Sequence, residues 1–381
     1  MVKTRERVIE MEYCYSTSSI KTKDIPELIN RIYLLSIDVT NVTQTDRQLI
    51  VTYEGDQEKS FHENLNRLIM EKDRQIRKKV IDENNKNLKV YGDFIHPVKE
   101  EEGISYKGDI ALLFEGIRKQ FDLLAQKYNA TYTKYPSIMS EKLMKKTNYA
   151  FHFPQNTYRV FEIKHQKENL EKYRLYSEYN LDTGDLFQSS DYYLRPCLCY
   201  FAYNDREDQS LSDELEVVSS FGQCFRHENN HQISPYRSRD FNMYEIIYLG
   251  CKEKVTETRD HLLEEVIKLF DQLGLKGKVE TANDPFFMKE DRNKIAYQRA
   301  GERKYELIFS PNKEISYSVA SFNLCDHVIT ESFNISTNKG ELAYSGCTAF
   351  GVERWVQAIV YTYGTNRQQW PECLQELIKN G

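Results

Sequence analysis

The sequence predicts an α+β fold in which helices cover one side of a large antiparallel sheet, with a smaller unit at the N-terminus. Two segments support this prediction. Residues 219–249 have the pattern of two long strands joined by a polar loop. Residues 345–363 have the pattern of a strand, a tight turn at Gly351 and an apolar helix in which Trp355 and Ile359 recur at helical spacing.

The composition limits the class of protein. The chain has 381 residues, of which 40% are hydrophobic and 29% charged, and its net charge is −6. This length suits one large domain or a core with a smaller appendage. The eight cysteines lack the spacing of a disulfide framework, which predicts a reduced protein. The N-terminus has no apolar segment, and no apolar run is long enough to span a membrane. These features together predict a cytoplasmic protein without a membrane segment. The net charge argues against wrapping of nucleic acid but allows a local basic groove.

Residues 1–105 are predicted to form the small N-terminal α+β unit. The charge run at Lys99–Gly103 marks its boundary with the main domain, residues 106–381. No group of catalytic residue types occurs in this unit, and its role is left unknown. The basic face at Arg74–Lys79 is interpreted as solvated. The predicted elements are a strand at 7–15, a helix at 24–35, a strand at 47–54 and a helix at 61–80.

The main domain begins with a periodic helix at 109–128 and a short strand that ends at Pro136. A polar insertion follows. Residues 192–203 are then predicted to form a buried strand that carries Cys197 and Cys199 on one face. The remaining predicted elements are a helix at 255–273 and strands at 304–308, 315–322 and 328–335.

The predicted hairpin carries residues that point to a ligand. Arg226 lies on its first strand, and Arg239, Phe241 and Glu245 share a face of the second. The two arginines could hold the phosphates of a nucleotide whose base stacks on Phe241. An ordinary salt-bridged hairpin explains the same spacing. Glu245 shares its face with apolar residues, and a buried acid needs a cation or a metal as its partner.

A second candidate for phosphate binding is Arg354. It lies in the first turn of the closing helix, where the N-terminus is already electropositive and a cation opposes the helix dipole. A solvated surface arginine is the simpler explanation. The alternative is a polyanionic partner such as phosphate.

Three segments resemble the signature motifs of class II aminoacyl-tRNA synthetases. Phe225–Glu228 resembles the second motif, Phe350–Arg354 the third, and the region of Pro136 the dimer-forming first. Within the superfamily, the chain most resembles the amino acid:[carrier protein] ligases, which are relatives of the atypical zinc-dependent seryl-tRNA synthetases. Further matching residues are Tyr135-Pro136, Phe153-Pro154, Cys199-Tyr200, Asn283–Phe287, Lys304 with Glu306, Ser321-Phe322-Asn323 and Gly346–Gly351.

This resemblance implies a class II synthetase-like fold and a site for ATP with Mg²⁺. Arg226 and Arg354 would be the catalytic residues, with Arg226 on the α-phosphate and Arg354 on the γ-phosphate. Phe241 would stack on adenine, and Glu228 would lie near the adenine or the phosphate-bound Mg²⁺. Asn323 is assigned to the same nucleotide site.

The resemblance also implies a zinc site. In the zinc-dependent relatives, two cysteines and a glutamate bind Zn²⁺, which captures the α-amino group of the substrate. The matching residues are Cys199, Glu245 and Cys347, each on a face that its predicted alternation makes available. Three protein ligands leave the fourth position open for an amine. Cys197 shares a predicted face with Cys199, so spacing alone cannot separate the two.

The implied function is that of an AMP-forming ligase. It would activate a small amino acid as its adenylate and transfer it to the phosphopantetheine thiol of a carrier protein, as a homodimer. We expect tRNA not to be the acceptor, because no anticodon-binding segment follows the closing helix. One alternative is an atypical seryl-type tRNA synthetase that uses the basic N-terminal unit. The other is a non-catalytic paralogue that acts as a binding protein, against which the retained arginines and metal ligands argue.

Overall fold

The structure, a computed structural model, describes residues 11–17, 25–70, 78–84, 90–97, 103–284, 298 and 301–379. The chain divides into two compact units. The smaller contains Met1–Gln75 and Asn229–Gln232, and the larger contains Ile76–Glu228 and Ile233–Gly381. Parts of several predicted features fall outside the described residues. These are 7–10 of the first predicted strand, Asp24 of the first predicted helix, 71–77 of the second with Arg74 and Arg77 of the basic face, 99–102 of the charge run, and Pro285–Phe287.

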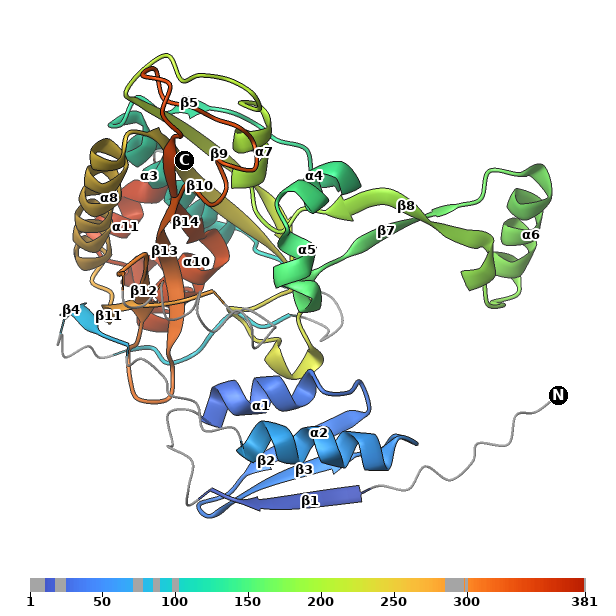
Figure 1. Ribbon diagram of the computed structural model, residues 1–381. Coiled ribbons are helices and arrows are strands. Elements are labelled where there is room, and N and C mark those ends of the chain that lie inside the picture. The colour runs from blue at the N-terminus through green and yellow to red at the C-terminus, as the bar shows by residue number, and fades with distance from the viewer. Residues whose placement is uncertain are drawn as a thin grey trace. The chain divides into compact units, whose positions relative to one another are not determined.

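The smaller unit is a three-stranded antiparallel sheet, in the order β1-β3-β2, with two helices. Helix α2 buries Phe61, Leu65 and Leu68, whose spacing defines one helix face. The ring of Phe61 stacks on that of Tyr53 with centroids 4.1 Å apart. The elements are β1 (Met11–Ser16), α1 (Ile25–Tyr33), β2 (Val39–Gln44), β3 (Gln48–Tyr53) and α2 (Glu58–Met70) (Figure 1).

The larger unit is built on an eight-stranded sheet in the order β4-β11-β12-β13-β14-β10-β9-β5. Every neighbouring pair is antiparallel except β5 and β9. The predicted α+β fold with a large antiparallel sheet is therefore confirmed. The strands are β4 (Val80–Glu83), β5 (Thr131–Tyr132), β9 (Leu215–Phe225), β10 (Asp240–Gly250), β11 (Gly277–Thr281), β12 (Lys304–Phe309), β13 (Tyr317–Asp326) and β14 (Tyr344–Gly351).

Four helices stand on one side of this sheet, namely α3 (Asp109–Gln126), α8 (Lys252–Gln272), α10 (Val352–Tyr363) and α11 (Glu372–Lys379) (Figure 1). Trp355 of α10 is fully buried, and its indole Nε1 donates to the carbonyl of Val319, 3.0 Å away. Phe121 of α3 stacks on Phe350 of β14 with centroids 4.1 Å apart. None of the helices in the described ranges is both long and apolar enough to cross a membrane.

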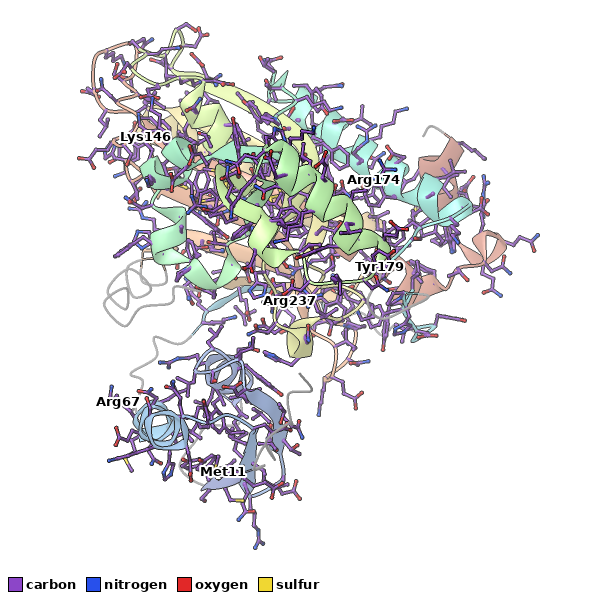
Figure 2. All side chains as sticks on the ribbon, turned by 90° about the vertical axis from the view of Figure 1, so that its right-hand side faces the viewer. Met11, Arg67, Lys146, Arg174, Tyr179 and Arg237 are labelled. Carbon is purple, nitrogen blue, oxygen red and sulfur yellow. The ribbon has the colours of Figure 1, made fainter. Side chains whose placement is uncertain are left out.

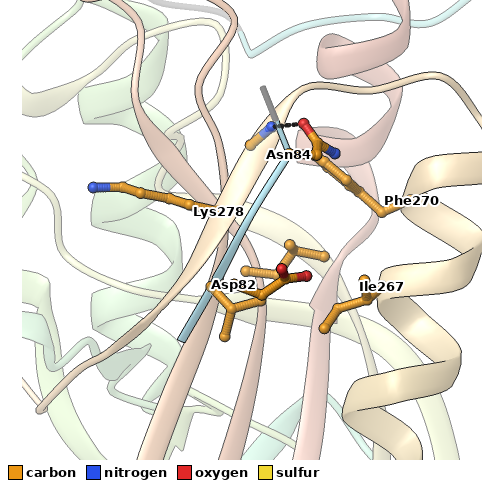
Figure 3. Close-up of a pocket in the computed structure, with 8 residues that line it drawn as sticks. Asp82, Asn84, Ile267, Phe270 and Lys278 are labelled. Atoms are coloured by element: carbon orange, nitrogen blue, oxygen red, sulfur yellow. Dashed lines mark hydrogen bonds between the residues drawn. The ribbon is translucent and has the colours of Figure 1, made fainter. Parts of the chain in front are cut away.

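Strand β4 forms one edge of the large sheet by antiparallel pairing with β11, and a side chain reinforces this pairing. Asn84 follows β4, and its Oδ1 accepts from the backbone N–H of Gly277, 3.0 Å away (Figure 3). Its Nδ2 donates to Asp271 Oδ1 at 2.7 Å and to the carbonyl of Leu275 at 3.2 Å. This strand precedes residue 105, yet it belongs to the main sheet. Val80, predicted to end a helix, begins β4 instead.

An arm extends from the body of the larger unit (Figure 1). It consists of β7 (Arg159–Ile163), α6 (Lys167–Glu178) and β8 (Phe187–Leu194), and β8 also pairs with β6 (Ile138–Ser140). Helix α6 has no buried residue. Figure 2, in which the arm faces the viewer, labels Arg174 and Tyr179 on it.

The buried strand predicted over residues 192–203 is wrong beyond Leu194. There β8 ends, and Cys199–Asn204 form helix α7. A short apolar run fits a buried helix as well as a strand, and Pro196 cannot donate to a strand ladder.

The strand predicted over 328–335 is also wrong. This segment forms successive turns, in which Glu331 N donates to His327 O at 2.9 Å and Phe333 N donates to Thr330 O at 3.2 Å. Its side chains are buried in places, as in a strand, but these backbone hydrogen bonds join residues three or four positions apart. Two short helices, α4 (Glu141–Lys146) and α5 (Tyr149–His152), complete the unit near the site.

Candidate active site

The sheet face opposite α8 and α10 carries a set of polar side chains. In one row of paired residues, Lys304 of β12, Asn323 of β13 and Cys347 of β14 lie side by side. In the row two residues further along, Glu306 pairs with Ser321, which pairs with Ala349, which pairs with Glu245 of β10. Side chains two residues apart on a strand share a face, so both rows line one surface.

Three potential metal ligands meet on this surface. The Sγ atoms of Cys199 and Cys347 and a carboxylate oxygen of Glu245 all lie within 4.8 Å of one another, and all three residues are buried. Glu245 and Cys347 come from strands, as predicted. Cys199 instead begins helix α7, so its position depends on a turn that sequence alternation does not describe.

The electrostatics of this cluster suit a divalent metal. Glu245 is 2% exposed, and burial, followed by the nearby Cys347, raises its pKa to about 8. It accepts from the backbone N–H of Leu198 at 3.0 Å, and no described cation forms an ion pair with it. Hydrogen bonds from Cys199 and Cys325 lower the pKa of Cys347. A buried carboxylate between thiols without a cation partner is a donor set that Zn²⁺ fits.

Asn323 and Cys197 lie beside the cluster. Asn323 Nδ2 is 3.4 Å from Cys347 Sγ and 3.2 Å from the carbonyl of the same residue. Asn323 therefore lies next to the candidate metal ligands, and a part in nucleotide binding stays a prediction. Cys197 Sγ is 3.5 Å from Cys199 Sγ, but only Cys199 belongs to the group that also includes Glu245.

Arg226 and Phe241 lie together at the loop end of the β9–β10 hairpin. Arg226 follows the last residue of β9, and its Cζ lies 5.2 Å from the centroid of the Phe241 ring. Its Nε and Nη2 donate to the carbonyl of Pro196, 3.3 and 3.2 Å away. The guanidinium therefore stands over the ring on which a base was predicted to stack.

Arg354 lies at the start of α10, as predicted, and faces the same hairpin loop. Its Nε donates to the carbonyl of Tyr236 at 3.0 Å, and its Nη1 donates to the carbonyl of Ser318 at 2.9 Å. Burial, then the like charges of Arg237 and Arg226, lower the pKa of Arg354. Such a concentration of guanidinium groups in a buried place favours an anionic ligand.

Arg237 is a site residue that the sequence analysis missed. Its Nη2 lies 2.7 Å from Glu228 Oε2, and Glu228 is buried. Its Nε is buried and has no hydrogen-bond partner in the described part of the chain. The alternation of the return strand drew attention to Arg239 instead. Arg237 lies in the loop, where strand periodicity gives no signal.

Lys304 of β12 extends the site and lies close to two carboxylates. Lys304 Nζ lies 2.6 Å from Asp284 Oδ1 and 3.7 Å from Glu306 Oε1. Gln298 Nε2 donates to Asp284 Oδ2 at 2.8 Å. Burial alone would lower the pKa of Lys304, but Asp284 and Glu306 raise it. The side chain thus stays charged next to Asn323.

One segment of five residues, Arg195–Cys199, connects these parts. The Arg195 guanidinium is buried and donates to the carbonyls of Tyr135 and Pro136 at 2.6 and 2.8 Å. Pro196 accepts from Arg226, Leu198 donates to Glu245, and Cys199 is itself a candidate ligand. The candidate metal centre and Arg226, one member of the arginine cluster formed by Arg226, Arg237 and Arg354, therefore contact the same segment.

Comparison with known proteins agrees with this geometry. Residues 182–363 match the family "tRNA synthetase class II core domain (G, H, P, S and T)". The chain is 27% identical over 259 residues to the type-2 serine–tRNA ligase of Methanococcus aeolicus, covering 64% of this chain and 49% of the relative. It is 24% identical over 274 residues to amino acid–[acyl-carrier-protein] ligase 1 of Bradyrhizobium diazoefficiens, covering 70% of this chain and 82% of the relative.

The chain thus spans about half the length of the type-2 serine–tRNA ligases it matches. Among solved structures, the seryl-tRNA synthetase of M. kandleri, in complex with tRNASec of A. aeolicus, superposes with a TM-score of 0.69 at 21% identity. That match covers 97% of this chain and 78% of the other. The chain therefore contains a class II aminoacyl-tRNA synthetase core domain, and its homologues include type-2 seryl-tRNA ligases and an amino acid–[acyl-carrier-protein] ligase.

Proposed function

We propose that this protein activates a small amino acid with ATP and transfers it to the phosphopantetheine thiol of a carrier protein. The proposal that the protein activates an amino acid with ATP depends on one observation: a single segment contacts both candidate binding sites. The Cys199–Glu245–Cys347 cluster, which suits zinc, and Arg226, which suits phosphate, are both bonded to the segment Arg195–Cys199. Amine and phosphate sites at this proximity suit condensation of an amino acid with ATP.

The metal would be Zn²⁺ held by Cys199, Glu245 and Cys347, which together leave one coordination position for the substrate amine. When bound, zinc would supply a Lewis-acid site that fixes the amine and rejects substrates without one. Lys304 and Asn323 lie on the same face next to Cys347, so they are the candidates to line the rest of a small amino acid pocket.

The arginines would act on ATP. The substrate carboxylate attacks the α-phosphorus, and pyrophosphate leaves, so the protein needs no nucleophile of its own. Arg226 would bind the α-phosphate while Phe241 stacks on adenine, and Arg354 with Arg237 would hold the outer phosphates. Glu228, fixed by Arg237, is the candidate to meet the Mg²⁺ that accompanies ATP. Catalysis would come from positioning and charge neutralisation.

Two candidate functions differ in the molecule that accepts the activated amino acid, which is a carrier protein in one and tRNA in the other. The match to the carrier-protein ligase spans 82% of that relative, against 49% of the M. aeolicus tRNA ligase, and this supports a carrier. Higher identity to the tRNA ligase and similarity to a tRNA-bound synthetase support an atypical seryl-tRNA synthetase as the second candidate.

The test offers both acceptors to the zinc-loaded protein with ATP and a radiolabelled amino acid. We expect label on a holo-carrier protein, released by mild thiol cleavage, and none on the same carrier without its phosphopantetheine arm. Label on tRNA alone would favour the seryl-type function. Acylation of neither acceptor, together with no adenylate formation, would favour a non-catalytic binding protein.

A further inference from the structure

We propose that Tyr236 is a positioning residue that holds the guanidinium of Arg354 in its phosphate-binding orientation. The proposal rests on the proposed function, in which Arg354 binds ATP. Tyr236 lies in the loop between β9 and β10 and would not touch the nucleotide itself. It would act through its backbone carbonyl, and its ring would fix where that carbonyl lies.

Two backbone carbonyls orient the Arg354 guanidinium. Tyr236 O accepts from Nε at 3.0 Å, and Ser318 O accepts from Nη1 at 2.9 Å. Arginine has more N–H donors than these two contacts use, so donors remain for an anion. Like charge from Arg237 and Arg226 would push the guanidinium away from this cluster unless the carbonyls held it.

The ring of Tyr236 is fixed on the strand that supplies the other carbonyl. It stacks on Tyr317 of β13 with centroids 4.1 Å apart and planes 7° apart. Tyr317 is 7% exposed, and its hydroxyl donates to the carbonyl of Arg354 at 3.3 Å. The stack therefore links a loop residue to β13 and to the start of α10. Loops are otherwise the more mobile parts of a fold.

Phe94, which precedes the residues that match the family, also packs against the ring of Tyr236. Phe94 lies with its ring centroid 5.3 Å from that of Tyr236 and 4.6 Å from that of Tyr361. Its neighbour Ile95 is clamped by the buried side chain of Gln357 on α10, which accepts from Ile95 N and donates to Ile95 O, both at 2.9 Å. The chain before the core domain thus contributes to the proposed ATP site.

The test measures amino-acid-dependent ATP–pyrophosphate exchange, with KM determined separately for ATP and for the amino acid. We expect Tyr236→Ala to raise the KM for ATP roughly tenfold, the effect of weakening one charge-assisted hydrogen bond. The KM for the amino acid and the zinc content should not change. Tyr236→Phe keeps the stack and should restore the ATP KM. Phe94→Ala should raise it less, and should add little to Tyr236→Ala because both act through one ring.

The matched control is Tyr179→Ala, which removes an exposed tyrosine from the arm and should leave both KM values unchanged. Should Tyr236→Ala fail to fold, Phe94→Ala still tests the proposal, with a smaller expected rise in the KM for ATP. An unchanged ATP KM in the folded Tyr236→Ala or Phe94→Ala variant overturns the proposal if Arg354→Ala abolishes exchange. Normal exchange in Arg354→Ala would instead overturn the proposed function of that arginine.

Discussion

At the scale of single residues, the site combines a buried acid that no described cation pairs with and three partly buried guanidinium groups around one loop. Glu245 lies among thiols, and Arg237, which is bonded to Glu228, lies with Arg226 close enough to Arg354 to lower its pKa. Each half is costly to bury alone. A metal cation beside Glu245 and a polyanion beside the arginines would each offset one of these costs. The two ligands bind different residues, so each can be tested independently.

The first residue-scale prediction concerns zinc. Purified protein should contain about one Zn²⁺ per chain, as a Cys/Glu/Cys ligand set implies. Cys199→Ala combined with Cys347→Ala should lose it. Cys373→Ala, which removes a cysteine remote from the cluster, is the matched control and should keep it. Stoichiometric zinc in the double variant, measured by elemental analysis, would rule out this ligand set.

The second concerns pH and the metal-free protein. The pKa of Glu245 is raised from 4.5 to about 8, so the folded protein holds a proton there that the unfolded chain releases. This contribution to stability is present at low pH and declines as the pH rises from about 4.5 to about 8. The slope is at most about 1.4 kcal/mol per pH unit. Chelator-treated wild type should show it, and Glu245→Gln should lack it. Equal slopes in urea unfolding across this range would contradict the prediction.

The third concerns the arginines. Arg226→Ala and Arg354→Ala should each reduce amino-acid-dependent pyrophosphate exchange by about two to three orders of magnitude, because each removes a charge-assisted contact to phosphate. Arg174→Ala, on the exposed arm, is the matched control and should behave as wild type. Circular dichroism should show all three folded. Near-normal exchange in either active-site variant would place the nucleotide elsewhere.

At the scale of elements, the sequence predicted the parts whose pattern is periodic. The β9–β10 hairpin and the β14–α10 unit lie where alternation and helical spacing placed them, and they carry Phe241, Glu245, Cys347 and Arg354. Cys199 was singled out as a candidate ligand and does lie in the Cys199–Glu245–Cys347 group, but it was predicted on a strand, because an apolar run has no period that separates a strand from a buried helix. Arg237 and Tyr236 lie in a loop, and their importance depends on three-dimensional contacts alone.

The element-scale prediction concerns the arm. Helix α6 has no buried residue, so replacing residues 166–182 by a short turn should leave the unfolding temperature and the zinc content of the protein unchanged. Strands β7 and β8 would remain paired through Ile163 and Phe187. A large fall in unfolding temperature would mean that α6 packs against something that supports the fold.

At the scale of the whole molecule, helices cover one face of the large sheet, and the other face carries the candidate site within a second apolar cluster. Helices α3, α8 and α10 cover the first with a continuous apolar core. The second presents Lys304, Glu306, Asn323, Cys347 and Glu245 in two adjacent rows. The antiparallel class of the sheet could be predicted from the sequence, but its strand order could not. In that order β13 lies next to β14 and β14 next to β10, so Asn323, Cys347 and Glu245 lie on neighbouring strands although they are far apart in the sequence.

The most direct test of the central claim is ATP–pyrophosphate exchange by the zinc-loaded protein, measured with each amino acid in turn. We predict exchange that requires an added amino acid, is largest with small side chains, and disappears when the amino acid is replaced by an analogue without its α-amino group. Exchange with no amino acid, or equal exchange with the analogue, would contradict an amine-binding metal beside an ATP site.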